Sequence, residues 1–140
     1  MNLAGWGTRV AASLIDALVV LPFLALAWIL DRPTVDATTG DMTGGGPIFW
    51  GLYLVAALVG AYNRWYLQGK TGRSWGKKTL GIKLVGEATG QPIGPLMAFV
   101  RELAHTIDGI ICGIGYLFPL WDAKKQTIAD KLVTTLVTKD

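Results

Sequence analysis

The feature that most constrains this chain is an apolar run from Val10 to Leu30 that contains one ionisable residue, Asp16. The run is about 21 residues long, and about 20 apolar residues suffice for an α-helix to cross the hydrocarbon core of a bilayer. A carboxylate at membrane depth costs about 2.5 kcal/mol or more, so it persists where it pairs, lines a wet cavity or has a function. The sequence therefore predicts a membrane helix with a polar site that faces protein.

The overall composition agrees with a membrane protein. Hydrophobic residues make up 51% of the chain and charged residues only 16%, whereas soluble domains carry about 25% charged residues. The net charge of +3 comes from basic residues beside apolar segments, which favours a membrane over a nucleic-acid partner. The N-terminus does not resemble a cleaved signal peptide. We expect one domain, residues 1–140, in a lipid bilayer.

A second apolar segment begins at Pro47 and extends to Tyr62, or to Leu67 if its polar end is included. With that extension it is again about 20 residues long, enough for a second crossing. Aromatic residues lie at both of its ends, as is typical at membrane–water interfaces. The residues between the two segments, 31–46, are rich in Gly, Thr and Asp, which predicts a loop. The pattern predicts an antiparallel transmembrane hairpin.

Basic residues give this hairpin an orientation. They gather without any acid in the stretch 64–83, at Arg64, Lys70, Arg73, Lys77, Lys78 and Lys83. Cytoplasmic loops carry an excess of Lys and Arg. We therefore expect this stretch and both termini on the cytoplasmic side of the plasma membrane, with residues 31–46 outside.

The third apolar region, Pro95 to Trp121, permits two interpretations. Its uninterrupted part, Gly109 to Trp121, is only about 13 residues long and is too short to span. The glycines and the proline within it favour a kinked segment that re-enters the membrane or lies at its interface, where protein or water covers the broken backbone. The alternative is a third crossing from about Leu96 to Leu120, with its polar residues facing the bundle.

Two short segments have the pattern of strands. Leu80, Ile82 and Leu84 alternate with other residues, and the C-terminal residues 132–140 are rich in β-branched side chains. The predicted fold class is thus an all-α membrane protein. It has two transmembrane helices, a third membrane-embedded segment that re-enters or spans, and a small cytoplasmic β-pair.

A polar stripe on the first helix is the first candidate site. Arg9, Ser13 and Asp16 are spaced at i, i+4 and i+7 and so share one helix face. One interpretation is that Asp16 pairs with a buried arginine and only fixes helix packing. The other is that Asp16 binds a cation or proton or lines a polar cavity.

A matching stripe lies on the third segment, where Arg101, His105 and Asp108 have the same spacing. Asp16 is expected to be neutralised by Arg9, by Arg101 or by a partner protein, and His105 could relay a proton. The alternative is again a polar stripe that only packs helices together.

Other chemistries are disfavoured by the sequence. A single histidine without further nitrogen or sulfur ligands predicts no transition-metal site. His105 and Cys112 lack a third orienting group, so the pattern predicts no enzyme. The phosphate-binding and dinucleotide-binding glycine motifs are also missing, and no cofactor is expected.

Three segments resemble the RDD family of small membrane proteins, which is named for an arginine and two aspartates. RVAASLID, residues 9–16, is similar to the family's opening motif, GRSWGKKTLGIKLV, residues 72–85, to its central segment, and residues 99–137 to its closing region. The second aspartate is matched to Asp130, with Asp122 as the alternative. The resemblance implies a helical membrane domain of unsettled role, for which transport has been suggested. It implies nothing for His105 and Asp108.

Two functions remain open from the sequence. The first is transport or ion and proton coupling through the Arg/Asp site. The second is a non-catalytic accessory or assembly subunit of a larger membrane complex. In either case we expect a homo-oligomer or other membrane proteins as partners, because two or three helices can barely enclose a polar path.

Overall fold

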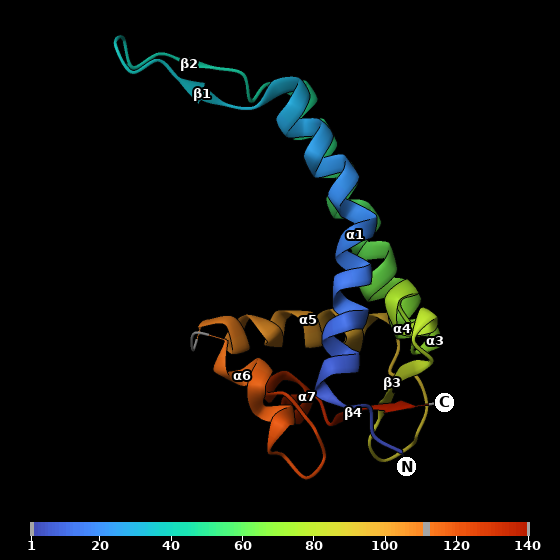
Figure 1. The fold of residues 1–140 in the computed structure, drawn as a ribbon. Coiled ribbons are helices and arrows are strands. Elements are labelled where there is room, and N and C mark those ends of the chain that lie inside the picture. Colours follow the sequence, from blue (N-terminus) through green and yellow to red (C-terminus); the bar gives the residue numbers. More distant parts are fainter. Residues whose placement is uncertain (1, 111–112, 140) are drawn as a thin grey trace. The chain divides into compact units, whose positions relative to one another are not determined.

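The computed structural model describes residues 2–110 and 113–139 and is mostly helical (Figure 1). The chain forms two compact units. We call residues 17–61 the hairpin unit, and residues 1–16 with 62–140 the polar unit. The first helix, α1 (Trp6–Asp31), contributes to both, because the division falls directly after Asp16.

In the hairpin unit, α1 is followed by α2 (Pro47–Ala61). The carboxylate of Asp31 accepts hydrogen bonds from the backbone N–H groups of Gly46 (2.8 Å) and Phe49 (3.3 Å). These groups lie at the start of α2, where N–H groups have no partner within the helix. Trp28 packs edge-on against Phe49, with ring centroids 6.2 Å apart. The end of α1 and the start of α2 are therefore joined by polar and aromatic contacts.

The connection between α1 and α2 is more regular than the loop that the sequence predicted. It contains two short antiparallel strands, β1 (Thr34–Val35) and β2 (Met42–Thr43). The hydroxyl groups of Thr34 and Thr43 lie 2.7 Å apart across the pair. Cross-strand threonine pairs stabilise such ladders, so the connection is a loop, as predicted, that also contains a short β-pair the sequence did not predict.

One helix in the described part of the chain is long and apolar enough to cross a membrane, and it is α1. In its most apolar window only 17% of the residues are buried, which differs from the core helix of a soluble protein. After α2 the backbone changes to a π-helix, η1 (Tyr62–Leu67), so the α-helical part of the second segment is shorter than predicted. Crossing by this second segment stays a prediction.

The polar unit is built from short elements around one longer helix. After η1 these are α3 (Gln68–Thr71), α4 (Trp75–Thr79), β3 (Ile82–Gly86), α5 (Pro95–Ile110), α6 (Ile114–Leu117), the 3-10 helix η2 (Phe118–Leu120), α7 (Ile128–Leu132) and β4 (Thr135–Lys139).

The predicted β-pair is confirmed. β3 and β4 are antiparallel neighbours, with Leu84 opposite Val137, and they lie beside each other near the two chain ends in Figure 1. Ile82, Leu84 and Val137 pack with Ala4 and Ala12 in a buried apolar cluster. The cluster therefore ties the start of the chain and the first turns of α1 to the β-pair.

Helix α5 has an inverted distribution of side chains. Its buried residues are Ala98, Arg101, His105 and Asp108, whereas its exposed residues include Leu96, Leu103, Ile107 and Ile110. An amphipathic helix whose apolar face points outward is typical of a membrane interface. The axes of α5 and of the α6–η2 segment differ by 106°, and Gly113 precedes α6 with a φ of 76°. Such a bend fits either a broken span or a re-entrant segment, so both interpretations of the third apolar region stay predictions.

Candidate functional site

Asp16 is buried, with 5% of its surface exposed. Its carboxylate accepts hydrogen bonds from the Asn63 side-chain amide (2.8 Å), the Ser74 hydroxyl (2.6 Å) and the Gly76 backbone N–H (2.8 Å). All three donors are uncharged. Asp16 therefore joins α1 to η1 and to the start of α4, and we call this set of residues the Asp16 site.

Local structure places each donor of the Asp16 site. Asn63 lies in the π-helical turn, a distortion that often occurs at functional positions, and its own oxygen accepts the Trp75 N–H (2.8 Å). Ser74 is the N-cap of α4. Gly76 lies so close to α1 that a Cβ there would overlap the carbonyl oxygen of Ala12. The absence of a side chain at position 76 allows α4 to reach Asp16.

The prediction that Arg9 or Arg101 neutralises Asp16 is wrong. Both guanidinium groups bind Asp130 instead, Arg9 at 2.5 Å and Arg101 at 2.7 Å. The spacing within one helix could not reveal this, because the partner lies 121 residues further along the chain from Arg9. Neutral donors suffice at Asp16 because each satisfies part of the hydrogen-bonding capacity of the carboxylate.

Asp130 is completely buried in α7, and we call Asp130 with Arg9 and Arg101 the ion cluster. Its carboxylate also accepts hydrogen bonds from the Thr135 hydroxyl (3.1 Å) and the Thr127 backbone N–H (3.2 Å). Burial alone raises the pKa of Asp130, but the guanidinium groups of Arg101 and Arg9 outweigh it and hold the pKa well below its ordinary value. The carboxylate is therefore ionised at neutral pH.

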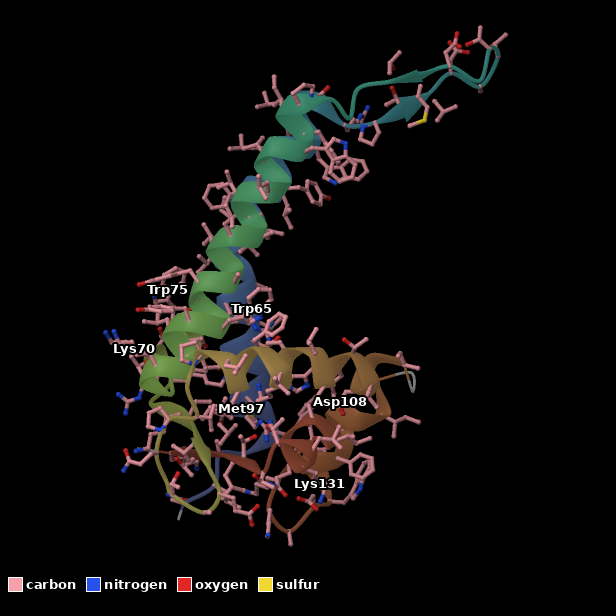
Figure 2. The ribbon with its side chains drawn as sticks, turned by 180° about the vertical axis from the view of Figure 1, so that it is seen from behind. Trp65, Lys70, Trp75, Met97, Asp108 and Lys131 are labelled. Carbon is pink, nitrogen blue, oxygen red and sulfur yellow. The ribbon has the colours of Figure 1, made fainter. Side chains whose placement is uncertain are left out.

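The start of α7 is tied to α5 by a second carboxylate. Asp108 accepts hydrogen bonds from the backbone N–H groups of Ile128 (3.1 Å) and Ala129 (3.4 Å). Figure 2 shows Asp108 on the side of α5 that faces the C-terminal part of the chain. The Asp108 carboxylate also lies 2.8 Å from Nδ1 of His105. Arg101, His105 and Asp108 share one buried face of α5, as predicted.

Among the described residues, His105 interacts with Asp108 and Tyr116 through its side chain and its carbonyl oxygen. Besides Asp108, its ring stacks on Tyr116 with centroids 5.1 Å apart, and the Tyr116 hydroxyl donates to the His105 carbonyl oxygen (3.2 Å). None of these contacts leads to Asp16. The arrangement gives no support to a proton relay from His105 to Asp16.

A cavity of about 310 Å³ lies in the polar unit and is lined by residues of α1, η1, α4, α5 and the C-terminal region. We call it the cationic cavity, because its described lining includes Arg9, Arg64, Lys77 and Arg101 and no acidic residue. Ser13 and His105 also line it. Asp16, Asp108 and Asp130 are not among its lining residues. Two of the cations are bound to Asp130, and Arg64 is bound to Glu102 at 3.2 Å.

Lys77 differs from the other cations of the cavity. Its side chain is buried, with 7% of the residue exposed, and its ammonium has no hydrogen bond or ion pair within the described residues. Burial lowers the pKa of Lys77 to about 7, and repulsion from Arg101 and Arg64 acts in the same direction, against attraction from Asp16. A buried ammonium without a counter-ion is costly, so Lys77 calls for an explanation.

Sequence reasoning found some members of these sites and missed others. It named Arg9, Arg101 and Asp130, which form the ion cluster, although it did not pair them. It missed Asn63, Ser74 and Lys77. Two signals were present in the sequence. Asn63 is a polar residue inside an apolar segment, and Ser74 and Lys77 lie in residues 72–85, the segment that resembles the central segment of the RDD family.

The described residues contain no group of three or more His, Cys, Asp or Glu side chains that could hold a metal ion. Cys112, the weak nucleophile candidate, lies outside the described residues. The predictions of no metal and no enzymatic activity remain untested.

Comparison with known proteins places the chain in context. The sequence profile of the RDD family, a membrane-associated family, matches residues 3–134. The chain is 42% identical over 94% of its length to the "Proline-rich antigen" of Mycobacterium leprae (strain TN). It is 40% identical over 94% of its length to a "Proline-rich antigen homolog" of Mycobacterium tuberculosis (strain CDC 1551 / Oshkosh). It spans 59% and 61% of the lengths of these relatives. No solved structure matches the chain.

Proposed function

We propose that this chain, which belongs to the RDD family, is a non-catalytic membrane module that serves as an accessory or assembly subunit. Its partner is another membrane protein or a second copy of the chain. The observation that carries the proposal is the state of Asp16, which is buried and bound by three neutral donors. In this arrangement Asp16 has a structural role, which we call the latch: its hydrogen bonds hold α1 against η1 and α4.

A carboxylate that couples ion movement must exchange its cation or proton with water. Asp16 is 5% exposed and does not line the cationic cavity. Releasing its three hydrogen bonds at every cycle would leave the donors of Asn63, Ser74 and Gly76 unsatisfied in a buried place, which is expensive. The geometry therefore favours a static role over a coupling role for Asp16.

The test compares Asp16→Asn with wild type in purified and reconstituted protein. The amide oxygen of asparagine can still accept from Asn63 and Gly76, and its NH₂ group can donate to the Ser74 hydroxyl. We expect near-normal amounts in the membrane, near-normal thermal stability, and no ion or proton flux above protein-free vesicles for either protein. A flux in wild type that Asp16→Asn abolishes, at equal protein content, would refute the latch and restore ion coupling.

Transport remains a second candidate because of the cationic cavity, whose lining contains an unpaired, buried Lys77. In this alternative the transported species is an anion, and transport depends on Lys77 rather than on Asp16. The same vesicles separate the two candidates: an anion flux that is lost in Lys77→Met and retained in Asp16→Asn favours transport.

The proposed location is the plasma membrane with both termini cytoplasmic. The support is the basic stretch 64–83 and the outward-facing apolar side of α5. Cysteine labelling tests it, in a Cys112→Ser background, at the exposed positions Thr38 and Lys139. We expect an impermeant reagent to label position 38 from outside and position 139 only after permeabilisation. Labelling of both positions from outside would overturn this topology.

A further inference from the structure

We infer that the cationic cavity is a binding site for a phosphate group, with Lys77 as its central ligand and Arg64 as a second. The inference does not depend on whether the chain is an accessory subunit or a transporter. It rests on the geometry of the polar unit, and each step follows from described contacts.

The first step is the charge of the lining. Four cations reach the cavity, from α1, η1, α4 and α5, and its described lining contains no acidic side chain. The ion cluster places one carboxylate, Asp130, between Arg9 and Arg101. Arg64 contacts Glu102 and is still 40% exposed at its side chain. Convergent cations with spare donors are the usual recognition pattern for phosphate oxygens.

The second step is the unpaired ammonium. Lys77 is more than nine-tenths buried, lines the cavity, and has no ion-pair partner in the part of the chain that the structure describes. Asp16 attracts it from a distance, but the Asp16 carboxylate is bound to Asn63, Ser74 and Gly76. A lysine acts as a point charge toward phosphate. An anion in the cavity would supply the missing counter-charge.

The third step is the size and chemistry of the space. The cavity measures about 310 Å³, far above the roughly 10–15 Å³ that one water needs by this measure. Its lining also includes the apolar side chains of Val10, Leu14 and Pro119. A phosphate that carries an organic group fits such a cavity, because the phosphate contacts the cations and the organic group contacts the apolar side chains. Basic pockets beside membrane helices bind anionic lipid headgroups in this way, and a soluble phosphate ester offers the same chemistry.

The experiment measures binding by the full chain, purified in a neutral detergent. In one arm inorganic phosphate is added, with chloride at matched ionic strength as the reference, and thermal unfolding is followed. In the other arm the chain is placed in nanodiscs of phosphatidylcholine with or without phosphatidylglycerol, and native mass spectrometry detects retained lipid. Stabilisation by inorganic phosphate identifies a soluble source, and retention of phosphatidylglycerol alone identifies a lipid headgroup.

The variants make the test specific. Lys77→Met removes the buried ammonium, and Lys78→Met makes the same change at the exposed neighbour on α4. We expect Lys77→Met to weaken phosphate or lipid binding about 10-fold to 100-fold, the loss typical of one charge-assisted hydrogen bond. Lys78→Met should bind like wild type. Lys77→Met should also raise the thermal stability of the unliganded chain, which a merely structural lysine would not do.

Two results overturn the inference. The first is that neither phosphate nor phosphatidylglycerol binds wild type more than chloride or phosphatidylcholine does. The second is that Lys77→Met and Lys78→Met weaken binding equally, which indicates a diffuse attraction to net charge. If Lys77→Met yields no folded protein, Arg64→Gln takes its place, with Lys70→Gln as its exposed control on α3, and the same two results decide.

Discussion

Asp16 and Asp130 are both buried aspartates of one unit, yet their partners differ in kind. Asp16 accepts hydrogen bonds from a side-chain amide, a hydroxyl and a backbone N–H. Asp130 lies between the guanidinium groups of Arg9 and Arg101. The charge of Asp130 is therefore essential to its partners, whereas at Asp16 the positions of acceptor oxygens matter more than the charge.

This difference assigns separate tasks to the two residues. The Asp16 site joins α1 to the π-helix and α4, segments about 50–60 residues away. The ion cluster joins α1 and α5 to α7 near the end of the chain. Removing one partner of a buried charge pair leaves an uncompensated charge, so the two sites should respond differently to the same substitution.

The largest effect is expected at Asp130. Asp130→Asn leaves Arg9 and Arg101 buried without their shared counter-charge, and breaking a buried pair typically costs about 3–5 kcal/mol. The free energy of unfolding of Asp130→Asn should be little higher than that of Asp130→Ala, because the NH₂ group of asparagine faces a guanidinium donor. Denaturant unfolding of the purified chain measures the loss. A cost of Asp130→Asn below that of Asp16→Asn would contradict the comparison.

The next effect is that of Asp16→Ala. It leaves three donors without their acceptor, and each unsatisfied buried group costs about 1–3 kcal/mol, with partial compensation by water. We expect a loss of about 2–3 kcal/mol in total on that basis, measured by the same unfolding. The more discriminating quantity is the share of the stability lost in the alanine variant that asparagine restores at the same position. This share should be large at position 16 and small at position 130. Equal rescue at both positions would remove the distinction between them.

The sequence predicted the fold better than it predicted the partners. The apolar run of α1, the strand character of residues 82–86 and 135–139 and the shared face of Arg101, His105 and Asp108 follow from local composition and periodicity. Periodicity reports which residues share a face of one element, and it carries no information on which element packs there. The assignment of Arg9 to Asp16 failed for this reason.

Three other features of the structure could not be predicted from sequence patterns. The π-helix at Tyr62–Leu67 replaces an expected α-helical end, and hydrophobic spacing hardly distinguishes the two. Gly76 matters because of the backbone of Ala12 behind it, which only the assembled structure reveals. Lys77 was read as one member of a basic stretch, since nothing local distinguishes its buried side chain from that of exposed Lys78.

The pH dependence of stability should report the charge of Asp130. Its pKa is lowered in the folded chain, so its contribution is fully present above the unfolded pKa of about 3.9 and is lost as the pH falls toward the folded pKa. We expect the stability difference between wild type and Asp130→Asn to shrink below pH about 4, by up to about 1.4 kcal/mol per pH unit. Unfolding of both proteins between pH 7 and pH 3 measures it, and a difference that grows toward low pH would contradict the assignment.

The smallest effect is expected at Asp122, the other candidate for the second family aspartate. Its carboxylate binds Lys131 at 2.7 Å, a lysine with 42% of its side chain exposed, and it accepts the Gln126 N–H at 3.0 Å. The attraction of Lys131 holds the pKa of Asp122 below its ordinary value, but exposed ion pairs contribute only about 0–1 kcal/mol. Asp122→Asn keeps an acceptor for the Gln126 N–H and should therefore cost less than about 1 kcal/mol. Measured beside Asp130→Asn, it tests whether the match to Asp130 is correct, because the family arginine, Arg9, binds Asp130. If Asp122→Asn destabilises the chain as much as Asp130→Asn does, then the contact with Arg9 is not what distinguishes the two aspartates.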